Sequence, residues 1–449
     1  MARLFGTDGV RGVANRDVTA ELALDLGTSA ARVLTARQDT GERRPRAVVG
    51  RDTRISGEFL GSAICAGLAG AGVDVTDVGV LPTPGVAHLT ASTDVDLGVV
   101  ISASHNPMPD NGIKLLARGG FKLDDAVEDE IAAGLGAVWE RPVGSHVGRI
   151  ADHSAFADRT YIDHLVAAAD QPLEGLRIAL DCANGAASDI APLALREAGA
   201  DVVVINASPD GRNINEKCGS THPEQLQAVT VASDAAFGVA YDGDADRCIA
   251  VDHTGALVDG DQIMGLLATA MKEAGILAHD TLVVTVMSNL GLLLAMRDAG
   301  IATVQTAVGD RYVLEAMRAG GYGLGGEQSG HIINSRYATT GDGILTSLLL
   351  ASRVVASGRP LADLASVVTR MPQVLVNVPD VDKARADADD GVAAAVQAAE
   401  QRLGETGRVL LRPSGTEPLV RVMVEAETVE EAEVVAHRLA GVVQERLAL

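Results

Sequence analysis

Residues 237–252 read FGVAYDGDADRCIAVD, two apolar runs on either side of an acidic loop. The first run, Phe237–Tyr241, is apolar at every position, which suits a strand that is buried on both faces. Similar runs, separated by Ala- and Leu-rich amphipathic stretches, recur at 47–50, 97–101, 178–180, 202–205 and 282–286. Strands that alternate with helices in this way predict a largely parallel α/β architecture up to about residue 365.

Beyond about residue 370 the pattern changes to that of a small α+β domain. The elements expected there are a strand at 374–378, a helix near 383–403, strands at 409–411 and 419–425, and a helix near 428–447. Polar or Pro-containing stretches near 141–155 and 370–373 suit domain boundaries, and spacing indicates another near 254–260. The sequence therefore predicts three α/β domains at 1–153, 154–256 and 257–370, and a C-terminal α+β domain at 371–449. No convincing sequence repeat is present, although the α/β part is compatible with diverged copies of one unit.

The 449-residue chain carries 60 acidic and 37 basic side chains, a formal net charge of -23. Its 47% apolar residues are typical of folded proteins, so the negative charge belongs to a globular surface. Nucleic acids and anionic membranes bind clustered Lys and Arg, and the 2% aromatic content disfavours base stacking. The composition does not exclude a small phosphorylated ligand, because a few Arg side chains that point to one place can bind a phosphate.

The cysteines point to a reducing compartment. Cys65, Cys182, Cys218 and Cys248 are scattered, with no C-x-x-C pair and no close His, so neither a disulfide framework nor a zinc site is expected. The N-terminal residues contain no apolar signal-peptide core. No stretch free of charged residues reaches the roughly 18–20 residues that cross a bilayer. We therefore expect a soluble, cytoplasmic protein.

The acidic loop after Phe237–Tyr241 is the strongest local signal. Asp242, Asp244 and Asp246 can converge only if the backbone bends, which Gly243 permits, and their convergence needs a cation. An EF-hand does not fit, because its sixth position would be Arg and its twelfth His. Mg²⁺ suits three carboxylates that leave a position for a phosphate oxygen. The alternative, a solvated acidic turn, agrees poorly with the apolar strands on both sides.

A second loop, SASHNP at 102–107, follows the apolar run at 97–101, with Asp110–Lys114 behind it. A Ser at the end of a strand can be a nucleophile, a helix N-cap or a turn former. The residues alone favour the N-cap for Ser104, and they favour a packed loop residue over a base for His105. The chain contains no G-x-S-x-G elbow, so a hydrolase serine is unsupported.

Three further loops contain polar groups that could bind a ligand. GGEQSGH at 325–331 offers mixed donors and acceptors for sugar hydroxyls, or is a glycine-rich turn. Gly321, Gly323 and Gly326 also match G-x-G-x-x-G, and we discount this match because no apolar strand precedes it and no helix clearly follows. RPSGTEP at 412–418, with Arg421, is either a phosphate cradle or a hairpin turn. FGTDGVRG at 5–12 places Arg11 in a glycine-rich loop as a candidate anion contact, and no Walker A motif exists.

Together these five motifs, in this order along the whole chain, closely resemble the α-D-phosphohexomutase superfamily. FGTDGVRG, GEQSGH and RPSGTEP resemble its glucosamine branch more than its phosphoglucomutase/phosphomannomutase branch. The resemblance implies four domains, the first three topologically related, each contributing a loop to a central cleft over which the fourth closes.

The resemblance also implies roles for residues. Ser104 becomes the phosphoserine, which overrides the N-cap preference. Asp242, Asp244 and Asp246 are expected to bind Mg²⁺ together with an oxygen of the phosphate on Ser104. Arg247 is expected to help neutralise the charge of that phosphate. Lys114 and His331 match candidates for proton transfer. The expected substrate contacts are Glu327 and Ser329 for hydroxyls, Arg412, Ser414, Gly415, Thr416 and Arg421 for the non-reacting phosphate, and Arg11 as the further anion contact.

The implied activity is the interconversion of glucosamine 6-phosphate and glucosamine 1-phosphate through a phosphoserine enzyme and a sugar 1,6-bisphosphate. It would feed amino-sugar nucleotide and cell-wall precursor synthesis, in a monomer or homodimer. A phosphoglucomutase/phosphomannomutase with the same mechanism is the nearest alternative. A non-catalytic phosphosugar-binding protein and a metal-dependent phosphatase with an aspartate nucleophile are the rivals from other classes.

Overall fold

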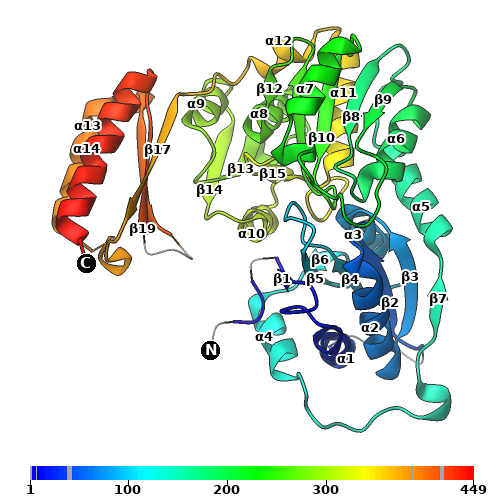
Figure 1. The fold of residues 1–449 in the computed structure, drawn as a ribbon. Coiled ribbons are helices and arrows are strands. Elements are labelled where there is room, and N and C mark those ends of the chain that lie inside the picture. Colours follow the sequence, from blue (N-terminus) through cyan, green and yellow to red (C-terminus); the bar gives the residue numbers. More distant parts are fainter. Residues whose placement is uncertain (1–2, 7, 38–42, 387, 415–418) are drawn as a thin grey trace. The chain divides into compact units, whose positions relative to one another are not determined.

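The computed structural model describes residues 3–6, 8–37, 43–386, 388–414 and 419–449 (Figure 1). The chain divides into two compact units, one comprising 1–287 and 301–367, the other 288–300 and 368–449. In the described part of the chain, the first unit holds three α/β sheets and the second a smaller antiparallel sheet. Among these residues, every helix is too short or too polar to span a bilayer.

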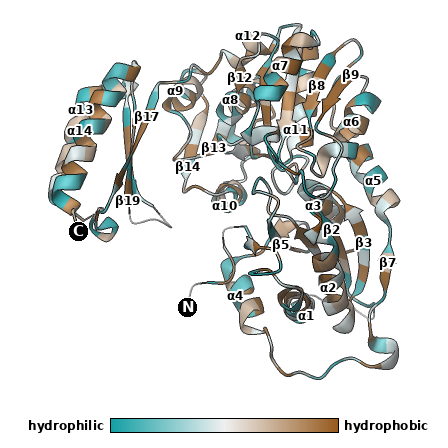
Figure 2. Ribbon diagram, in the orientation of Figure 1, coloured by the Kyte–Doolittle hydropathy of each residue, from teal (hydrophilic) through white to brown (hydrophobic). Residues whose placement is uncertain are grey.

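The N-terminal sheet has the strand order β1-β5-β4-β2-β3-β7, with β6 added beside β5. Its strands are β1 (Val10–Val13), β2 (Arg46–Arg51), β3 (Asp74–Val80), β4 (Leu97–Ile101), β5 (Asp110–Ala117), β6 (Phe121–Lys122) and β7 (Ile150–Asp152). Its helices are α1 (Ala20–Ala36), α2 (Ser56–Gly70), α3 (Thr83–Ser92), α4 (Asp125–Ala133) and α5 (Ser154–Ala167). Apolar side chains of α1 and α2 share one core with the sheet. In Figure 2 the strands of this sheet carry brown, hydrophobic segments.

The second sheet has the order β12-β11-β10-β8-β9, and the third β14-β13-β15-β16. The second consists of β8 (Arg177–Asp181), β9 (Asp201–Ile205), β10 (Phe237–Tyr241), β11 (Cys248–Asp252) and β12 (Leu257–Val258), with α6 (Ala187–Glu197) and α7 (Glu224–Ala232). The third consists of β13 (Thr281–Thr285), β14 (Ala302–Thr306), β15 (Leu324–Gly326) and β16 (Ile332–Asn334), with α8 (Gly260–Glu273), α10 (Asp310–Gly320), α11 (Gly343–Ser357) and α12 (Leu361–Ala365).

The three sheets repeat one topology. When β1 is left aside, the third strand of each sheet in chain order pairs in parallel with the first, which pairs in parallel with the second: β4-β2-β3, β10-β8-β9 and β15-β13-β14. The fourth strand then returns antiparallel beside the third, as β5, β11 or β16. The α/β part is therefore three diverged copies of one unit, and each copy ends in an equivalent hairpin: β4–β5, β10–β11 or β15–β16.

Local sequence explains the boundaries of several elements. Strands β4 and β10 are buried at every position, as their uninterrupted apolar runs predict. Helix α1 begins after Thr19, whose hydroxyl accepts from the Leu22 amide. Helix α8 begins with a reciprocal capping box between Asp259 and Gln262. These signals fix where the helices start and thus where the strand-end loops lie.

The second unit packs two helices on an antiparallel sheet of order β17-β19-β18. It contains α9 (Leu290–Asp298), β17 (Gln373–Pro379), α13 (Asp390–Leu403), β18 (Arg408–Pro413), β19 (Leu419–Glu425) and α14 (Val429–Leu447). The carboxylate of Glu425, buried in this unit, accepts hydrogen bonds from Asn289 and Leu290 and pairs with Arg408 at 2.8 Å. These contacts tie α9 to the C-terminal sheet.

The predicted fold class is confirmed: mixed, mostly parallel α/β sheets precede a smaller C-terminal α+β domain. One local expectation was wrong. The helix expected from 383 begins at Asp390, because Asp389 accepts from the amides of Gly391 and Val392 and so caps it, while Lys383–Arg385 forms a separate 3-10 turn. The short strand β15 lies within the G-x-G-x-x-G match at 321–326, and helix α10 rather than a strand precedes that match. The predicted domain boundaries stay predictions.

Candidate active site

The three equivalent hairpins carry the three central motifs, and they meet. Ser104 lies between β4 and β5, Asp242 between β10 and β11, and His331 between β15 and β16. The Ser104 hydroxyl donates to Asp242 Oδ2 at 2.5 Å. Residues Arg247 and His331 form an isolated antiparallel bridge between the second and third hairpins. The contact between Ser104 and Asp242 joins residues that are 138 positions apart in the sequence.

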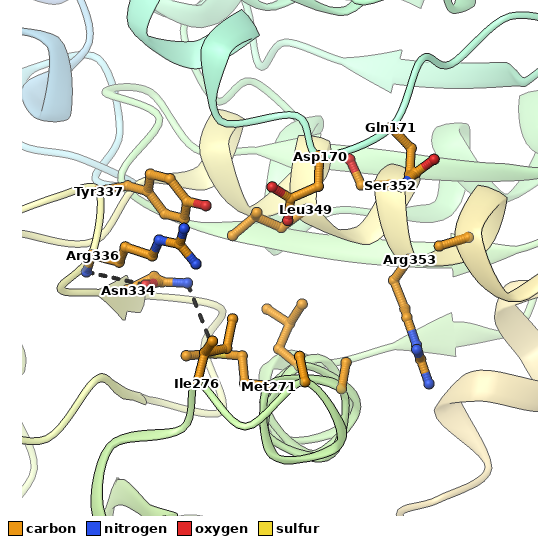
Figure 3. A pocket seen from close by; sticks show the side chains of 14 residues that line it. Asp170, Gln171, Met271, Ile276, Asn334, Arg336, Tyr337, Leu349, Ser352 and Arg353 are labelled. Atoms are coloured by element: carbon orange, nitrogen blue, oxygen red, sulfur yellow. Dashed lines mark hydrogen bonds between the residues drawn. The ribbon is translucent and has the colours of Figure 1, made fainter.

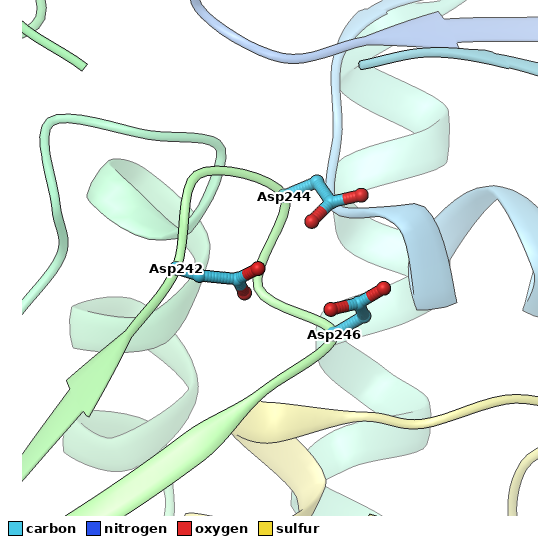
Figure 4. Close-up of side chains that lie close together, drawn as sticks. All are labelled: Asp242, Asp244 and Asp246. Atoms are coloured by element: carbon cyan, nitrogen blue, oxygen red, sulfur yellow. The ribbon is translucent and has the colours of Figure 1, made fainter. Parts of the chain in front are cut away.

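The three aspartates form a cluster that could hold a metal ion. One oxygen from each of Asp242, Asp244 and Asp246 lies within 4.8 Å of the others, and all three residues are buried (Figure 4). Among the described residues, one oxygen of Asp244 and one of Asp246 have no hydrogen-bond partner. Buried carboxylate oxygens without donors are hard ligands of the kind that Mg²⁺ takes. The residues present therefore fit a divalent cation.

The bend that brings the aspartates together does not arise where the sequence placed it. Ala245, with φ of 57°, is the residue in the left-handed region. Gly243 serves a different purpose, because a Cβ at this position would lie 2.6 Å from the Ser104 carbonyl oxygen. Glycine is needed here for the close approach of two loops rather than for the turn.

Electrostatics distinguish the aspartates. Burial, together with the charges of Asp246 and Asp244, holds the pKa of Asp242 well above its usual range. Burial acts in the same direction on Asp244, but the Lys114 ammonium outweighs it and lowers the pKa of Asp244. Lys114, on β5, is itself buried, and its Nζ lies 2.8 Å from Asp244 Oδ2 and 3.6 Å from Asp246 Oδ2. These carboxylates raise the pKa of Lys114 despite its burial, so it is protonated.

Beyond Lys114, acidic and basic side chains alternate in a row that we call the charge chain: Asp244, Lys114, Asp8, Lys122, Asp310 and His331. Lys114 Nζ lies 3.0 Å from Asp8 Oδ2, and Lys122 pairs with both Asp8 and Asp310. Asp310 Oδ2 lies 3.3 Å from His331 Nε2, which is 3.9 Å from Asp246 Oδ2. The chain therefore runs from the aspartate loop through the N-terminal sheet to the third hairpin.

Sequence reasoning missed several members of this site. Asp8 lies within the N-terminal motif, but the sequence pattern assigns it no role. It also pairs with Arg11. Lys122 and Asp310 carry no local signal at all. Thr83, the first residue of α3, donates its hydroxyl to Asp244 Oδ2 at 2.6 Å and its amide to the Asp244 carbonyl at 3.0 Å. It could have been found only as a polar residue at the carboxyl end of a strand, β3.

The Ser104 loop is not a helix cap. No helix follows Ser104 directly; the chain turns into β5, so the N-cap preference drawn from the residues alone was wrong. Ser104 is 1% exposed and has φ of 51°. His105 Nδ1 lies 3.3 Å from the Ser104 hydroxyl, and burial followed by the charges of Arg247 and Arg11 lowers the pKa of His105 to about 4. His105 is therefore neutral beside Ser104 at physiological pH.

The remaining predicted residues are partly placed. Glu327 Oε1 accepts from the Gly309 amide at 3.0 Å, and Ser329 is exposed. Arg247 is partly exposed beside the aspartates, and their charges raise its pKa against the effect of burial. In the second unit, Arg412 and Arg421 are paired positions of β18 and β19, and Ser414 is buried at the end of β18. Gly415 and Thr416 lie outside the described residues.

A separate cavity of about 240 Å³ lies between α8, α11 and the segment after α5 (Figure 3). Its lining is mostly apolar and includes Met271, Ile276 and Leu349. Asp170 and Arg336 also line it. None of its lining residues belongs to the motif loops. The groups able to perform chemistry are gathered at the hairpins, so we place the candidate active site there.

Comparisons with known proteins agree with this assignment. The models of the phosphoglucomutase/phosphomannomutase domains match in chain order: α/β/α domain I at 2–139, domain II at 159–255, domain III at 259–371 and the C-terminal domain at 375–442. A solved phosphoglucomutase/phosphomannomutase family protein from Burkholderia thailandensis superimposes with a TM-score of 0.82 at 24% identity, covering 99% of this chain and 97% of that one. An Aspergillus fumigatus N-acetylphosphoglucosamine mutase, solved in complex with GlcNAc-6P and magnesium, gives 0.68 at 19% identity over 98% and 95%. These structures show the fold.

Sequence relatives narrow the family. A protein from Bifidobacterium adolescentis described as phosphoglucosamine mutase is 62% identical over 459 residues, covering the whole of both chains. Another of the same description, from Acidothermus cellulolyticus, is 64% identical over 445 residues, covering 99% of this chain and 96% of its own. The chain therefore belongs to the phosphoglucosamine mutase family of isomerases, within the phosphoglucomutase/phosphomannomutase superfamily.

Proposed function

We propose that the protein interconverts glucosamine 6-phosphate and glucosamine 1-phosphate, with Ser104 carrying the phosphoryl group that is exchanged. The observation that supports this most is the buried contact between the Ser104 hydroxyl and Asp242, at a carboxylate cluster with unpartnered oxygens. The substrate assignment comes from the relatives described as phosphoglucosamine mutases.

Asp242, Asp244 and Asp246 would hold Mg²⁺, with an oxygen of the Ser104 phosphate as a further ligand. Bound there, the cation would offset the negative charge that makes a phosphoserine a poor electrophile. Arg247 adds a second positive charge beside the same loop. The site thus supplies positive charge where the phosphoryl group would lie, although the protein as a whole has a net charge of -23.

The reaction exchanges one phosphorus–oxygen bond for another. A free hydroxyl of the bound sugar phosphate attacks the phosphorus on Ser104; a bond to the sugar oxygen forms, the bond to Ser104 Oγ breaks, and a 1,6-bisphosphate results. After the sugar turns end for end, the other phosphate returns to Ser104. Asp244 and its acidic neighbours raise the pKa of Lys114, so its ammonium keeps its proton and suits charge stabilisation. His331, whose ring nitrogens make no hydrogen bond to the described residues, is our candidate to accept the hydroxyl proton.

The other sequence-derived contacts complete the proposal. Glu327 and Ser329 would hold sugar hydroxyls from the third hairpin, and Arg11 would contact the substrate's anionic groups. Arg412, Ser414, Gly415, Thr416 and Arg421 would hold the phosphate that is not reacting. One such cradle has to accept either phosphate in turn, because the sugar reverses between half-reactions.

A coupled assay with intact-protein mass measurement tests the proposal. We expect conversion of glucosamine 6-phosphate to the 1-phosphate that depends on Mg²⁺ and a bisphosphate primer, and one phosphate on the protein that Ser104→Ala abolishes. The control Ser29→Ala removes another buried hydroxyl, one that donates to the Ile131 carbonyl at 2.7 Å, and should keep both properties. Preference for glucose or mannose phosphates would overturn the substrate. Free phosphate release by an active Ser104→Ala would overturn the mechanism.

We also propose a cytoplasmic location. The four cysteines are buried and none is in a disulfide, which suits a reducing compartment. The monomeric or homodimeric state stays a prediction.

A further inference from the structure

The backbone of Ser104 has a conformation that must be held in place. Its φ of 51° lies in the left-handed region, which is unfavourable for a non-glycine residue. Relaxation to a negative φ would swing the hydroxyl away from Asp242, to which it now donates at 2.5 Å. Contacts around the loop therefore have to outweigh this cost.

On the carbonyl side of Ser104, Arg54 provides the restraint. The Arg54 side chain is completely buried, and its Nη2 donates to the carbonyls of Ser104 at 2.9 Å and Asn106 at 2.8 Å. Its Nη1 donates to the Pro107 carbonyl at 2.7 Å. One guanidinium thus holds three carbonyls of a single turn, and Asn215 adds a hydrogen bond of 2.9 Å to the Ser104 carbonyl.

On the amide side of Ser104, Ser102 provides the restraint. The Ser102 hydroxyl accepts from the Ser104 amide at 2.9 Å and donates to Asp52 Oδ2 at 2.6 Å. The same Asp52 oxygen accepts from Arg54 Nε at 2.9 Å, and Asp52 Oδ1 accepts from the Arg54 amide at 2.9 Å. A single buried carboxylate therefore connects the two groups that hold Ser104 from either side.

We propose that Asp52, Arg54 and Ser102, the Ser104 clamp, are positioning residues for phosphoryl transfer, an inference that rests on the proposed phosphoserine role of Ser104. The hydrogen-bond partners of the Ser104 hydroxyl are Asp242 and His105, and none of the three clamp residues is among them. They fix the backbone on both sides of Ser104, so that Oγ keeps one position relative to the aspartates with and without its phosphate. Sub-ångström placement of a reacting oxygen is where positioning has the largest kinetic effect.

The geometry separates positioning from simple packing. Asp52 and Arg54 follow the carboxyl end of β2, next to the reacting loop. At the opposite end of the same sheet, Arg43 donates to both oxygens of Asp96, also buried, at 2.6 and 2.7 Å. This second pair also joins an Arg to a buried Asp, although the Arg43 side chain is 24% exposed. It holds no part of the Ser104 loop, so it is the control.

The first experiment compares Ser102→Ala with Ser29→Ala in the full-length enzyme. Without the Ser102 hydroxyl, the Ser104 amide loses its acceptor, and we expect kcat to fall ~10–100-fold with KM within about twofold. Ser29→Ala should lower the melting temperature as much or more while keeping kcat. If Ser102→Ala retains kcat, or loses it only in proportion to folded protein, the proposal is wrong.

The second experiment compares Arg54→Lys with Arg43→Lys by the rate at which glucose 1,6-bisphosphate phosphorylates the protein, followed by intact mass. Lysine keeps the charge but cannot reach three carbonyls, so Arg54→Lys should be phosphorylated at least tenfold more slowly than Arg43→Lys. Equal rates would overturn the clamp while leaving the proposed function intact. If the parent enzyme is never phosphorylated on Ser104, the proposed function itself fails. If Arg54→Lys does not fold, the Ser102→Ala result decides alone.

Discussion

The Lys114 ammonium is the cation on which the metal-free site most depends. Replacing Lys114 by Met keeps a similar length of apolar side chain and removes only the charge, leaving Asp244 and Asp246 without the cation now 2.8 and 3.6 Å away. Breaking a buried ion pair from one side costs about 3–5 kcal/mol, because the remaining charge stays buried. We therefore expect Lys114→Met to lower the free energy of unfolding by ~3–5 kcal/mol in the absence of metal.

Urea unfolding of the parent and variant in EDTA measures this loss, and Lys272→Met controls for the removal of a lysine. The Lys272 side chain is 31% exposed, and its Nζ lies 3.9 Å from Asp280 Oδ2. The free energy of unfolding of Lys272→Met should therefore fall by no more than ~1 kcal/mol. Adding Asp244→Asn to Lys114→Met should recover part of the loss, with a coupling energy of ~0.5–3 kcal/mol. A loss at Lys114 no larger than at Lys272, with no coupling to Asp244, would refute the reasoning.

Three other changes test separate features. Thr83→Val removes the donor to Asp244 Oδ2, and titration calorimetry should show Mg²⁺ binding weakened ~10–100-fold. Burial and the charge of His164, whose ring stacks on His88, lower the pKa of His88 to about 4, below its unfolded value of ~6.5. Between these two values the unfolded chain binds a proton that the folded protein does not, so stability is lost as the pH falls from about 6.5 to about 4. His88→Gln should reduce the fall in melting temperature across this window; an unchanged fall would contradict the assignment. Gly243→Ala would push a Cβ against the serine loop, and kcat should fall ~100-fold; full activity would show that the loops need not touch.

Much of this site could be predicted because parallel strands gather their carboxyl ends. The apolar runs of β4 and β10 identify buried strands, and polar residues directly after them, such as Ser104 and Asp242, lie at the ligand-binding edge. These loops lie at the ends of three separate sheets, so their convergence was implied by the family resemblance and not by the strand pattern. The buried aspartate cluster agrees with the predicted metal loop, and its occupation by Mg²⁺ stays a proposal.

The rest depends on packing between distant segments. Lys122 and Asp310 meet across 188 positions, and Thr83 reaches Asp244 across 161. No local pattern distinguishes these residues from any other polar side chain, because their partners are set by how the sheets pack together. Arg54 is intermediate: it follows a predicted strand, yet its acceptors are carbonyls, which the sequence does not reveal.

The charge chain also bears on how this protein can drift in sequence. Asp8, Lys114 and Lys122 each have an oppositely charged neighbour on both sides, as ions do inside a one-dimensional lattice. Reversing one of these charges turns two attractions into repulsions at once, and no single second change restores both. These three residues can therefore be exchanged only in concert.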